Sequence, residues 1–310
     1  MKIGILSRNP HLYSTKRLVE MGVKHGHRVQ VVDTLSIIVD LTSHSPDNLI
    51  KVLNRRPPVF GASAWGMSSQ AVRYLPPFDV VIPRIGTTIT DYGLAVVRQF
   101  EYRGVFVTAS SLGISQSRDK LASLQLMSHK GLPVPKTAVI EREESLGVAM
   151  QIVGGPPAIM KLSHGTQGRG VILVKNMATA VAVYQKLRNT NNQILLQEFL
   201  PEAEGKDTRV IVVGDQCVAA MQREAPQGDF RSNLHLGGTA VKIKLTQEAK
   251  DIALAATNAH GLQVAGVDII HSNRGSLILE VNSSPGLEGI EKTSGQNVAK
   301  SIIQYIEQSI

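Results

Sequence analysis

The sequence contains a single cysteine, Cys217, among its 310 residues. One thiol can form neither an intramolecular disulfide framework nor a cysteine metal cluster, so both kinds of site are excluded. Cys217 lies in the apolar stretch 212–221, where a free cysteine usually behaves as a small core residue. We therefore expect this cysteine to be structural and not catalytic.

Long apolar runs, internal repeats and low-complexity tracts are also absent from the sequence. The short apolar run at 3–6 is followed by Arg8 and Pro10, unlike the long apolar core of a signal peptide. No later run approaches the roughly 18 apolar residues that a membrane helix needs. We therefore expect a soluble, cytoplasmic protein that has no contact with a membrane.

Acidic residues are outnumbered by basic ones, 25 to 33, which gives a formal net charge of +8. This balance suits anionic ligands such as a nucleotide, a carboxylate or a ribosome-associated partner. A basic surface that contacts only solvent explains the same numbers equally well. The 43% hydrophobic content and the length suffice for two or three compact units with real cores, as in a globular enzyme.

The first third of the chain alternates between apolar runs and amphipathic segments, which is typical of a small α/β domain with a parallel sheet. Ser14 is a suitable cap for a first helix that Gly26 ends, and Gly104 ends a second one. Residues 42–77 are instead rich in Ser, Pro and Gly, and we expect an irregular loop or insertion there. The expected strands are 2–6, 28–33 and 79–82, and the expected helices are 14–25 and 91–103.

The organisation changes near Ser117, where a linker and a domain boundary precede a helix predicted at 118–130. We predict three regions: an α/β domain at 1–110, a central subdomain at 111–197 and a C-terminal subdomain at 198–310. The expected strands of the two later regions are 157–162, 171–174, 194–198, 209–213, 217–221, 264–270 and 276–281, and the expected helices are 178–187, 247–260 and 295–308.

Three oxygen-bearing side chains lie on the last two predicted strands: Asp268, Glu280 and Asn282. The period of two along a strand puts Glu280 and Asn282 on one face, and a neighbouring strand can bring Asp268 beside them. A site of oxygen ligands that is incomplete by itself suits Mg²⁺, which completes its octahedron with water and phosphate oxygens. Two solvated carboxylates at a sheet edge are the alternative, but near-continuous apolar strands around them argue against it.

A glycine-rich loop at 164–170 lies between two apolar strands. It lacks the Gly-Lys-Ser/Thr of a Walker loop, and no helix follows it directly as in a dinucleotide-binding fingerprint. Taken alone, such a loop is more often a hairpin turn than a ligand site. Its backbone amides can nevertheless close over phosphate oxygens, with Lys161 adding a positive charge. The candidate contacts in the loop are Gly165, Gln167 and Gly168.

Two further polar segments lie between predicted core strands. Residues 197–201 resemble a chain crossing between two subdomains, where free backbone groups can hydrogen-bond a base. The loop 228–238 is polar and rich in glycine, and Arg223 and Arg231 could hold a carboxylate or an acyl phosphate through paired donors. An exposed loop with scattered charge is the alternative interpretation of the second segment.

The order of these parts resembles the ATP-grasp enzymes, and more narrowly their RimK branch, the α-L-glutamate ligases that add glutamate to the C-terminus of a small-subunit ribosomal protein. The resemblance covers nearly the whole chain but departs from the branch at 42–77, which is longer than expected and bears on the protein substrate. The motifs that carry it are 82–86, 118–120, Lys161, the glycine-rich loop, 197–199, 207–209, 228–235, Asp268 and 280–292.

The resemblance implies a small N-terminal parallel-sheet domain followed by an ATP-grasp fold of two subdomains, α/β and in part α+β. It also assigns roles to residues at the matching positions. Lys120 and Lys161 would contact ATP phosphates, Glu198 and Phe199 the adenine, Asp207 the ribose, and Arg231, Ser232 and Asn233 the nucleotide or acyl phosphate. Asp268, Glu280 and Asn282 would hold two Mg²⁺ or Mn²⁺ ions, with Glu280 bridging them, and Arg223 and Arg231 are the catalytic candidates.

The implied reaction passes the γ-phosphoryl group of ATP to a carboxylate, and the amine of L-glutamate then attacks the acyl phosphate. No nucleophilic side chain is required, which agrees with the lack of an evident serine or cysteine triad. We expect a protein C-terminus as acceptor, a homo-oligomer, and no direct reading of nucleic acid. One alternative is an ATP-grasp ligase for a small peptide, an amino-acid carrier protein or a D-amino acid. The other is a non-catalytic nucleotide- or ribosome-binding module.

Overall fold

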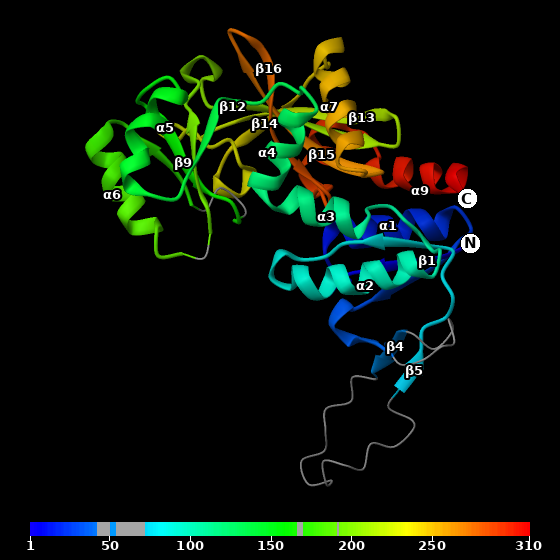
Figure 1. Cartoon of the computed structure of the whole chain (residues 1–310). Helices are drawn as coiled ribbons and strands as arrows, with labels where there is room; N and C mark the ends of the chain where they lie inside the picture. The colour runs from blue at the N-terminus through cyan, green and yellow to red at the C-terminus, as the bar shows by residue number, and fades with distance from the viewer. Residues whose placement is uncertain (42–49, 54–71, 166–169, 191) are drawn as a thin grey trace. The chain divides into compact units, whose positions relative to one another are not determined.

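The computed structural model describes residues 1–41, 50–53, 72–165, 170–190 and 192–310. The chain divides into two compact units (Figure 1): Met1–Leu112 together with Ala299–Ile310, and Gly113–Val298. The predicted central and C-terminal subdomains thus lie in one unit. No helix in the described part of the chain is long and apolar enough to cross a membrane.

The first unit is built on a parallel sheet with the strand order β2-β1-β6-β7. All residues of β6 are buried, and Ile3 and Ile5 on β1 are fully buried, as expected for central strands of a parallel sheet covered on both faces. The predicted strands and helices of this domain are confirmed to within two residues. The elements are β1 (Lys2–Leu6), α1 (Tyr13–Lys24), β2 (Arg28–Val32), β6 (Val80–Pro83), α2 (Thr90–Tyr102) and β7 (Phe106–Val107).

The prediction of an irregular segment at 42–77 is wrong for part of it. There β4 (Ile50–Leu53) and β5 (Val72–Tyr74) pair antiparallel with each other, and β4 pairs with β3 (Ile37–Val39). These strands contain β-branched and aromatic residues, but runs this short are hidden by the surrounding Ser, Pro and Gly. Residues 42–49 and 54–71, with Trp65 among them, lie outside the described residues.

The helix α9 (Val298–Ser309) differs from the predicted division, because from Ala299 onward it belongs to the first unit and not to the region 198–310. Its apolar side chains Ile302, Ile303 and Ile306 are buried. At its end, Glu307 is hydrogen-bonded to the imidazoles of His25 (3.1 Å) and His27 (2.9 Å), which follow α1. An apolar stripe and these hydrogen bonds therefore attach this helix to the first unit.

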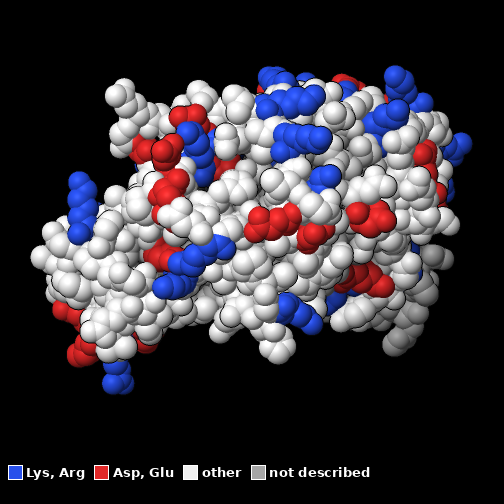
Figure 2. Space-filling view, turned by 90° about the horizontal axis from the view of Figure 1, so that it is seen from above, with Lys and Arg blue, Asp and Glu red and all other residues white. Residues whose placement is uncertain are grey.

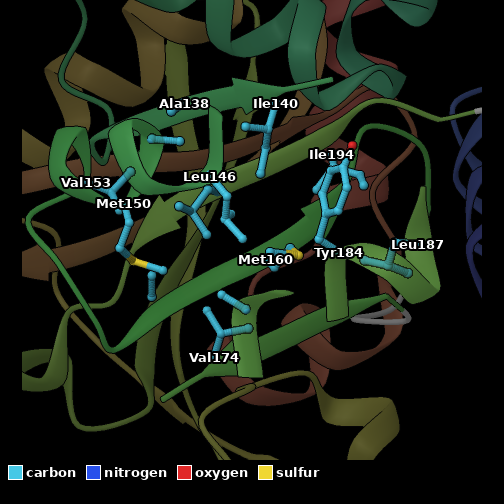
Figure 3. Packing of buried hydrophobic residues seen from close by; sticks show 14 residues of the cluster. Ala138, Ile140, Leu146, Met150, Val153, Met160, Val174, Tyr184, Leu187 and Ile194 are labelled. Carbon is cyan, nitrogen blue, oxygen red and sulfur yellow. The ribbon is translucent and has the colours of Figure 1, made fainter. Parts of the chain in front are cut away.

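The second unit contains a four-stranded antiparallel sheet in the order β10-β9-β11-β8. Two helices cover its core, where Met160 from the sheet packs with Leu146 and Tyr184 from the helices (Figure 3). The helix predicted at 118–130 is confirmed as α4 (Lys120–His129), which the side chain of Asp119 caps. The other elements are α3 (Ser111–Arg118), β8 (Thr137–Ile140), α5 (Leu146–Ile152), β9 (Ala158–Leu162), β10 (Val171–Val174), α6 (Met177–Leu187) and β11 (Ile194–Glu198).

A five-stranded antiparallel sheet in the order β14-β13-β12-β15-β16 completes the second unit. Most residues of its central strands β12 and β15 are buried, which accounts for the near-continuous apolar runs in the sequence. The predicted strands are confirmed. The elements are β12 (Lys206–Val213), β13 (Gln216–Glu224), β14 (Thr239–Lys242), α7 (Gln247–Ala259), β15 (Val264–Ser272), β16 (Gly275–Asn282) and α8 (Glu288–Ser294).

Lysine and arginine side chains lie beside aspartate and glutamate side chains across the face drawn in Figure 2. The basic excess of the composition is therefore mixed with acidic groups on this face. Such a distribution resembles an ordinary solvated surface more than the continuous basic stripe of a nucleic-acid-binding protein.

Candidate active site

A pocket in the second unit is lined by residues from both of its sheets. Most of the predicted site residues surround it, although they are spread over more than 150 positions of the sequence. Asn282 does not line the pocket, and Gln167 and Gly168 lie outside the described residues. The predicted residues that line it are Lys120, Lys161, Gly165, Glu198, Phe199, Asp207, Arg223, Arg231, Ser232, Asn233, Asp268 and Glu280.

Charged side chains form a row across three neighbouring strands of the five-stranded sheet. Arg209 on β12 pairs in register with Asp268 on β15, and Asp268 pairs with Glu280 on β16. Residues in register share a face of the sheet, so the three side chains lie side by side. The register shifts directly after Asp268, which leaves Leu279 as an extra residue of a β-bulge. Bulges re-aim side chains, and Leu279 lines the pocket together with Glu280.

The carboxylate of Asp268 is hydrogen-bonded to two arginines. Arg209 donates from Nε to Oδ1 at 2.7 Å and from Nη2 to Oδ2 at 2.6 Å, and Arg223 donates to Oδ2 at 2.9 Å. Arg223 also makes a bidentate pair with Asp207, at 2.7 and 2.6 Å. Burial alone would raise the pKa of Asp268, but the guanidinium groups of Arg209 and Arg223 hold it well below its ordinary value. Asp268 is therefore an anion at any physiological pH.

Glu280 lies beside this network with its carboxylate 3.8 Å from Arg209. Burial, and next the negative charge of Asp268, raise the pKa of Glu280, while Arg209 and Lys120 act in the opposite direction. Two neighbouring carboxylates of this kind are stabilised by a cation. The donor set therefore fits a divalent metal ion that binds oxygen.

Asn282 extends the same face of the sheet, because it lies across from Gly266 on β15, two residues before Asp268. Its Oδ1 accepts a hydrogen bond from the backbone N–H of Ser284 at 2.8 Å. No group of three or more His, Cys, Asp or Glu in the described part of the chain suits a metal ion. A metal held by Asp268, Glu280 and Asn282 therefore needs water or phosphate oxygens to complete its coordination.

Two lysines lie in the wall of the pocket near Glu280. Lys120, the first residue of α4, donates from Nζ to the carbonyl of Gly165 at 2.6 Å. Lys161 on β9 is 6% exposed, and its Nζ donates to Oε1 of Gln197 at 3.0 Å. Burial, and next the charge of Lys120, lower the pKa of Lys161 to about 8. Two ammonium groups with neutral hydrogen-bond partners suit a polyanion such as a chain of phosphates.

The side chain of Glu198 is occupied by protein partners. Its carboxylate accepts a hydrogen bond from the backbone N–H of Lys136 at 2.7 Å and makes a bidentate ion pair with Arg274. Burial would raise the pKa of Glu198, but Arg274 and the Lys136 amide lower it overall. The backbone N–H of Glu198 donates to the carbonyl of Lys136 at 2.9 Å, so a contact between Glu198 and a base would fall to its backbone carbonyl. Beside it, the rings of Phe199 and Phe230 meet edge to face, with centroids 6.1 Å apart.

The loop that holds Arg231 is organised by Asp229. One carboxylate oxygen of Asp229 accepts from the backbone N–H groups of Phe230 (2.7 Å) and Arg231 (3.0 Å), and the other accepts from the Arg231 guanidinium at 2.8 Å. The Arg231 side chain lowers the pKa of Asp229 to about 2. Arg231 also lies over the Phe230 ring, at 5.9 Å from its centroid. Asp229 thus fixes both the ring and the guanidinium at the edge of the pocket.

Sequence reasoning assigned no role to several residues of this site. Arg209 could have been found, because it follows Asp207 by two positions on a strand and therefore shares its face. Phe230 lies within a motif that was recognised, and only its ring contact with Phe199 identifies it. The Arg274 pair with Glu198 spans 76 positions, and no local pattern signals it.

Comparisons with known proteins agree with this arrangement. Residues 117–306 match the RimK-like ATP-grasp domain, and residues 1–57 and 66–114 match the RimK PreATP-grasp domain. A protein of Marinomonas sp. named "Probable alpha-L-glutamate ligase" is 48% identical over 313 residues, which cover 100% of this chain and 96% of the relative. A protein of Azotobacter vinelandii with the same name is 47% identical over 309 residues, with the same coverage.

Solved structures share the fold at low sequence identity. The ATP-grasp ligase PsnB, in a complex with a phosphomimetic variant of its minimal precursor, Mg and ADP, gives a TM-score of 0.72 at 20% identity, covering 100% of this chain and 98% of that one. A RimK domain protein from Sphaerobacter thermophilus gives 0.69 at 18% identity, covering 99% and 100%. The family matches and the full-length relatives show that this chain belongs to the RimK family of ATP-grasp enzymes and is an ATP-dependent ligase that joins a carboxylate to an amine.

Proposed function

We propose that this ligase adds L-glutamate to the C-terminal carboxylate of a protein, and that the acceptor is a protein of the small ribosomal subunit. The observation that carries the chemistry is the convergence of Lys120 and Lys161 with Asp268 and Glu280 around one pocket. Ammonium groups and a metal-binding carboxylate pair are what phosphoryl transfer requires. The choice of glutamate is supported by the full-length relatives named as probable α-L-glutamate ligases.

In the first step, an oxygen of the acceptor carboxylate attacks the γ-phosphorus of ATP, the bond to the β-phosphate oxygen breaks, and ADP leaves. Lys120 and Lys161 hold phosphate oxygens and offset the charge that develops on them. Two Mg²⁺ or Mn²⁺ ions, held by Asp268, Glu280 and Asn282, would supply further charge neutralisation at the phosphates. The product of this step is an acyl phosphate.

In the second step, the amine of glutamate attacks the acyl carbon, the carbon–oxygen bond to phosphate breaks, and the proton that the amine loses passes to the departing phosphate or to water. Arg231 at the pocket edge can bind a carboxylate or the acyl phosphate once it leaves Asp229, because its fork matches two oxygens. Arg223 is held by Asp207 and Asp268 on two sides, so it acts as a fixed positive charge. The products are an amide, ADP and phosphate.

Mass spectrometry of purified ribosomal proteins incubated with the enzyme, ATP and L-glutamate tests this proposal. We expect a mass increase of one or more glutamyl residues at one C-terminus. Incubations without glutamate, or with a Glu280→Gln variant, serve as controls and should leave every mass unchanged. If ADP forms only with a small non-protein acceptor, the proposed acceptor is wrong.

A second candidate is a ligase that acts on a short peptide. It is favoured by a solved structure of PsnB, a complex with the precursor peptide PsnA2 and AMPPNP. A panel of synthetic peptides with free or amidated C-termini separates the two candidates. Glutamate addition to a free-standing peptide, with no addition to ribosomal proteins, would favour this second function.

A further inference from the structure

Asp268 has two roles that conflict. It is a proposed metal ligand, yet both of its oxygens already accept hydrogen bonds from arginines. Oδ1 accepts one from Arg209, and Oδ2 accepts one from Arg209 and one from Arg223. A divalent ion that binds Asp268 would meet two guanidinium groups at hydrogen-bond distance from the same carboxylate. These hydrogen bonds use three of about four lone-pair sites of the carboxylate, so the metal approaches beside two guanidinium groups and its charge repels both of them.

The two arginines differ in what else holds them. Arg223 is 3% exposed and has a bidentate partner in Asp207, so it loses only one hydrogen bond if Asp268 turns to a metal. Arg209 makes both of its ion-pair hydrogen bonds with Asp268, and its other acidic neighbour in the described part of the chain is Glu280 at 3.8 Å. Both acidic neighbours of Arg209 are therefore proposed metal ligands.

Charge balance adds to this argument. Around the proposed metal site, four cationic side chains are balanced by four carboxylates: Lys120, Lys161, Arg209 and Arg223 against Asp119, Asp207, Asp268 and Glu280. This group carries no net charge before any metal arrives, so a bare divalent ion creates an excess of positive charge. The phosphates of a nucleotide offset that excess. A metal ion that is bound to phosphate is therefore repelled less by the cationic side chains than a metal ion alone.

We propose that Arg209 is a resident counter-ion of the metal site, which competes with the divalent ion for Asp268 and Glu280. While the site is empty, Arg209 neutralises the two carboxylates and holds Asp268 in place. Metal binding displaces Arg209. The site therefore binds a bare metal ion weakly, and it binds the ion more tightly when the ion arrives with a nucleotide. Arg209 is thus a positioning residue, and this inference rests on the ATP-dependent function proposed above.

Electron paramagnetic resonance of free Mn²⁺, titrated into the protein without nucleotide, tests the proposal directly. Arg209→Met removes the charge at nearly the same length, and we expect it to bind Mn²⁺ on the order of tenfold more tightly, because a charged hydrogen-bond pair no longer competes. Arg209→Lys keeps a charge but lacks the fork, so its affinity should lie between those of Arg209→Met and the unaltered protein.

Arg274→Met is the matched control for the loss of one positive charge. Arg274 makes a bidentate pair with Glu198, which lines the same pocket, but it has no contact with Asp268 or Glu280. Its Mn²⁺ affinity should equal that of the unaltered protein. An equal gain in Arg274→Met, or unchanged or weaker binding by Arg209→Met, overturns the proposal.

A measurement on the unaltered protein covers the case in which Arg209→Met fails to fold. The Nε–H of Arg209 is observable by ¹⁵N NMR and is assigned by its loss in Arg209→Lys. Its exchange with water should be slow in the empty protein and become faster when diamagnetic Mg²⁺ is added. Protection that persists at saturating Mg²⁺ refutes displacement. These readouts require no product, so failure of the glutamate assay and failure of this inference are distinguishable.

Discussion

Lys161 is a buried lysine whose charge depends on pH in the range where enzymes are assayed. Burial and the charge of Lys120 lower its pKa to about 8, so the folded protein releases this proton before an ordinary lysine does. Phosphate oxygens beside Nζ would favour the charged form and raise the pKa again. Nucleotide binding is therefore linked to proton uptake above pH 8.

This linkage predicts that ATP affinity falls as pH rises from 8 toward 10, by up to about tenfold per pH unit, because the bound state needs a proton that the free state has lost. Calorimetric titration of ATP at several pH values measures it. Lys161→Arg keeps its charge throughout and should weaken the pH dependence. The same pH dependence in Lys161→Met would show that another group is responsible.

Glu280 gives a second prediction at the residue scale. Glu280→Gln keeps the size of the side chain but removes the charge that the metal needs, so we expect loss of Mn²⁺ binding in the presence of nucleotide and loss of turnover. The fold should persist, because burial and Asp268 already raise the pKa of Glu280 and a neutral amide relieves that repulsion.

Thermal unfolding and ADP release measure the two effects of this substitution. Asp215→Asn removes an exposed carboxylate in the turn between β12 and β13 and is the control. Turnover by Glu280→Gln at the level of this control would contradict the metal assignment.

At the scale of elements, the strand β15 requires a glycine next to the metal residues. A Cβ on Gly266 would lie 2.9 Å from Cβ of Pro285, which follows Asn282 in the turn after β16. That contact is shorter than van der Waals distance. Gly266 thus allows the turn to pack against the strand and keeps Asn282 on the face of Asp268.

We expect Gly266→Ala to lower the free energy of unfolding by roughly 1–3 kcal/mol, because the overlap forces the turn to shift. Metal affinity in the presence of ATP should fall with it, since Asn282 lies in register with Gly266. Gly286→Ala, one residue after Pro285, meets open space and is the matched control. Denaturant unfolding measures the free energy of unfolding of both variants, and Mn²⁺ titration in the presence of ATP measures their metal affinity.

The sequence predicted the strands of this site well, because their apolar runs and the alternation of Glu280 with Asn282 are local signals. It did not predict the β-bulge at Leu279, which depends on how two strands align. Nor did it predict that Arg274 pairs with the carboxylate of Glu198, which leaves the expected contact with a base to the backbone. Contacts between positions far apart in the sequence determine which groups of a recognised motif remain available to a ligand.

At the scale of the molecule, α9 returns to the unit formed by the start of the chain. Sequence order suggested that it belongs with 198–310, because a helix usually packs with its neighbours along the chain. An apolar stripe alone does not say which surface will bury it. The contacts of Ile303 near Gly22, and of Glu307 with His25 and His27, reveal the partner.

Ile303→Ala should therefore destabilise the first unit by about 2–5 kcal/mol, since it leaves a cavity under a fully buried side chain. Gln304→Ala, on the exposed side of the same helix, is the control and should change little. Differential scanning calorimetry of both variants tests this. Equal midpoints for Ile303→Ala and the unaltered protein would mean that α9 adds no stability.

The return of α9 also has a consequence for synthesis. The second unit, 113–298, is interposed in the chain between two pieces of the first. Translation runs from the N-terminus, so the ribosome has made every residue of the second unit before it makes α9. The second unit can thus fold while the helix α1, which precedes it in the chain, still exposes the surface near Gly22 that Ile303 covers in the finished protein. The part of the enzyme that is translated first is the part that is completed last.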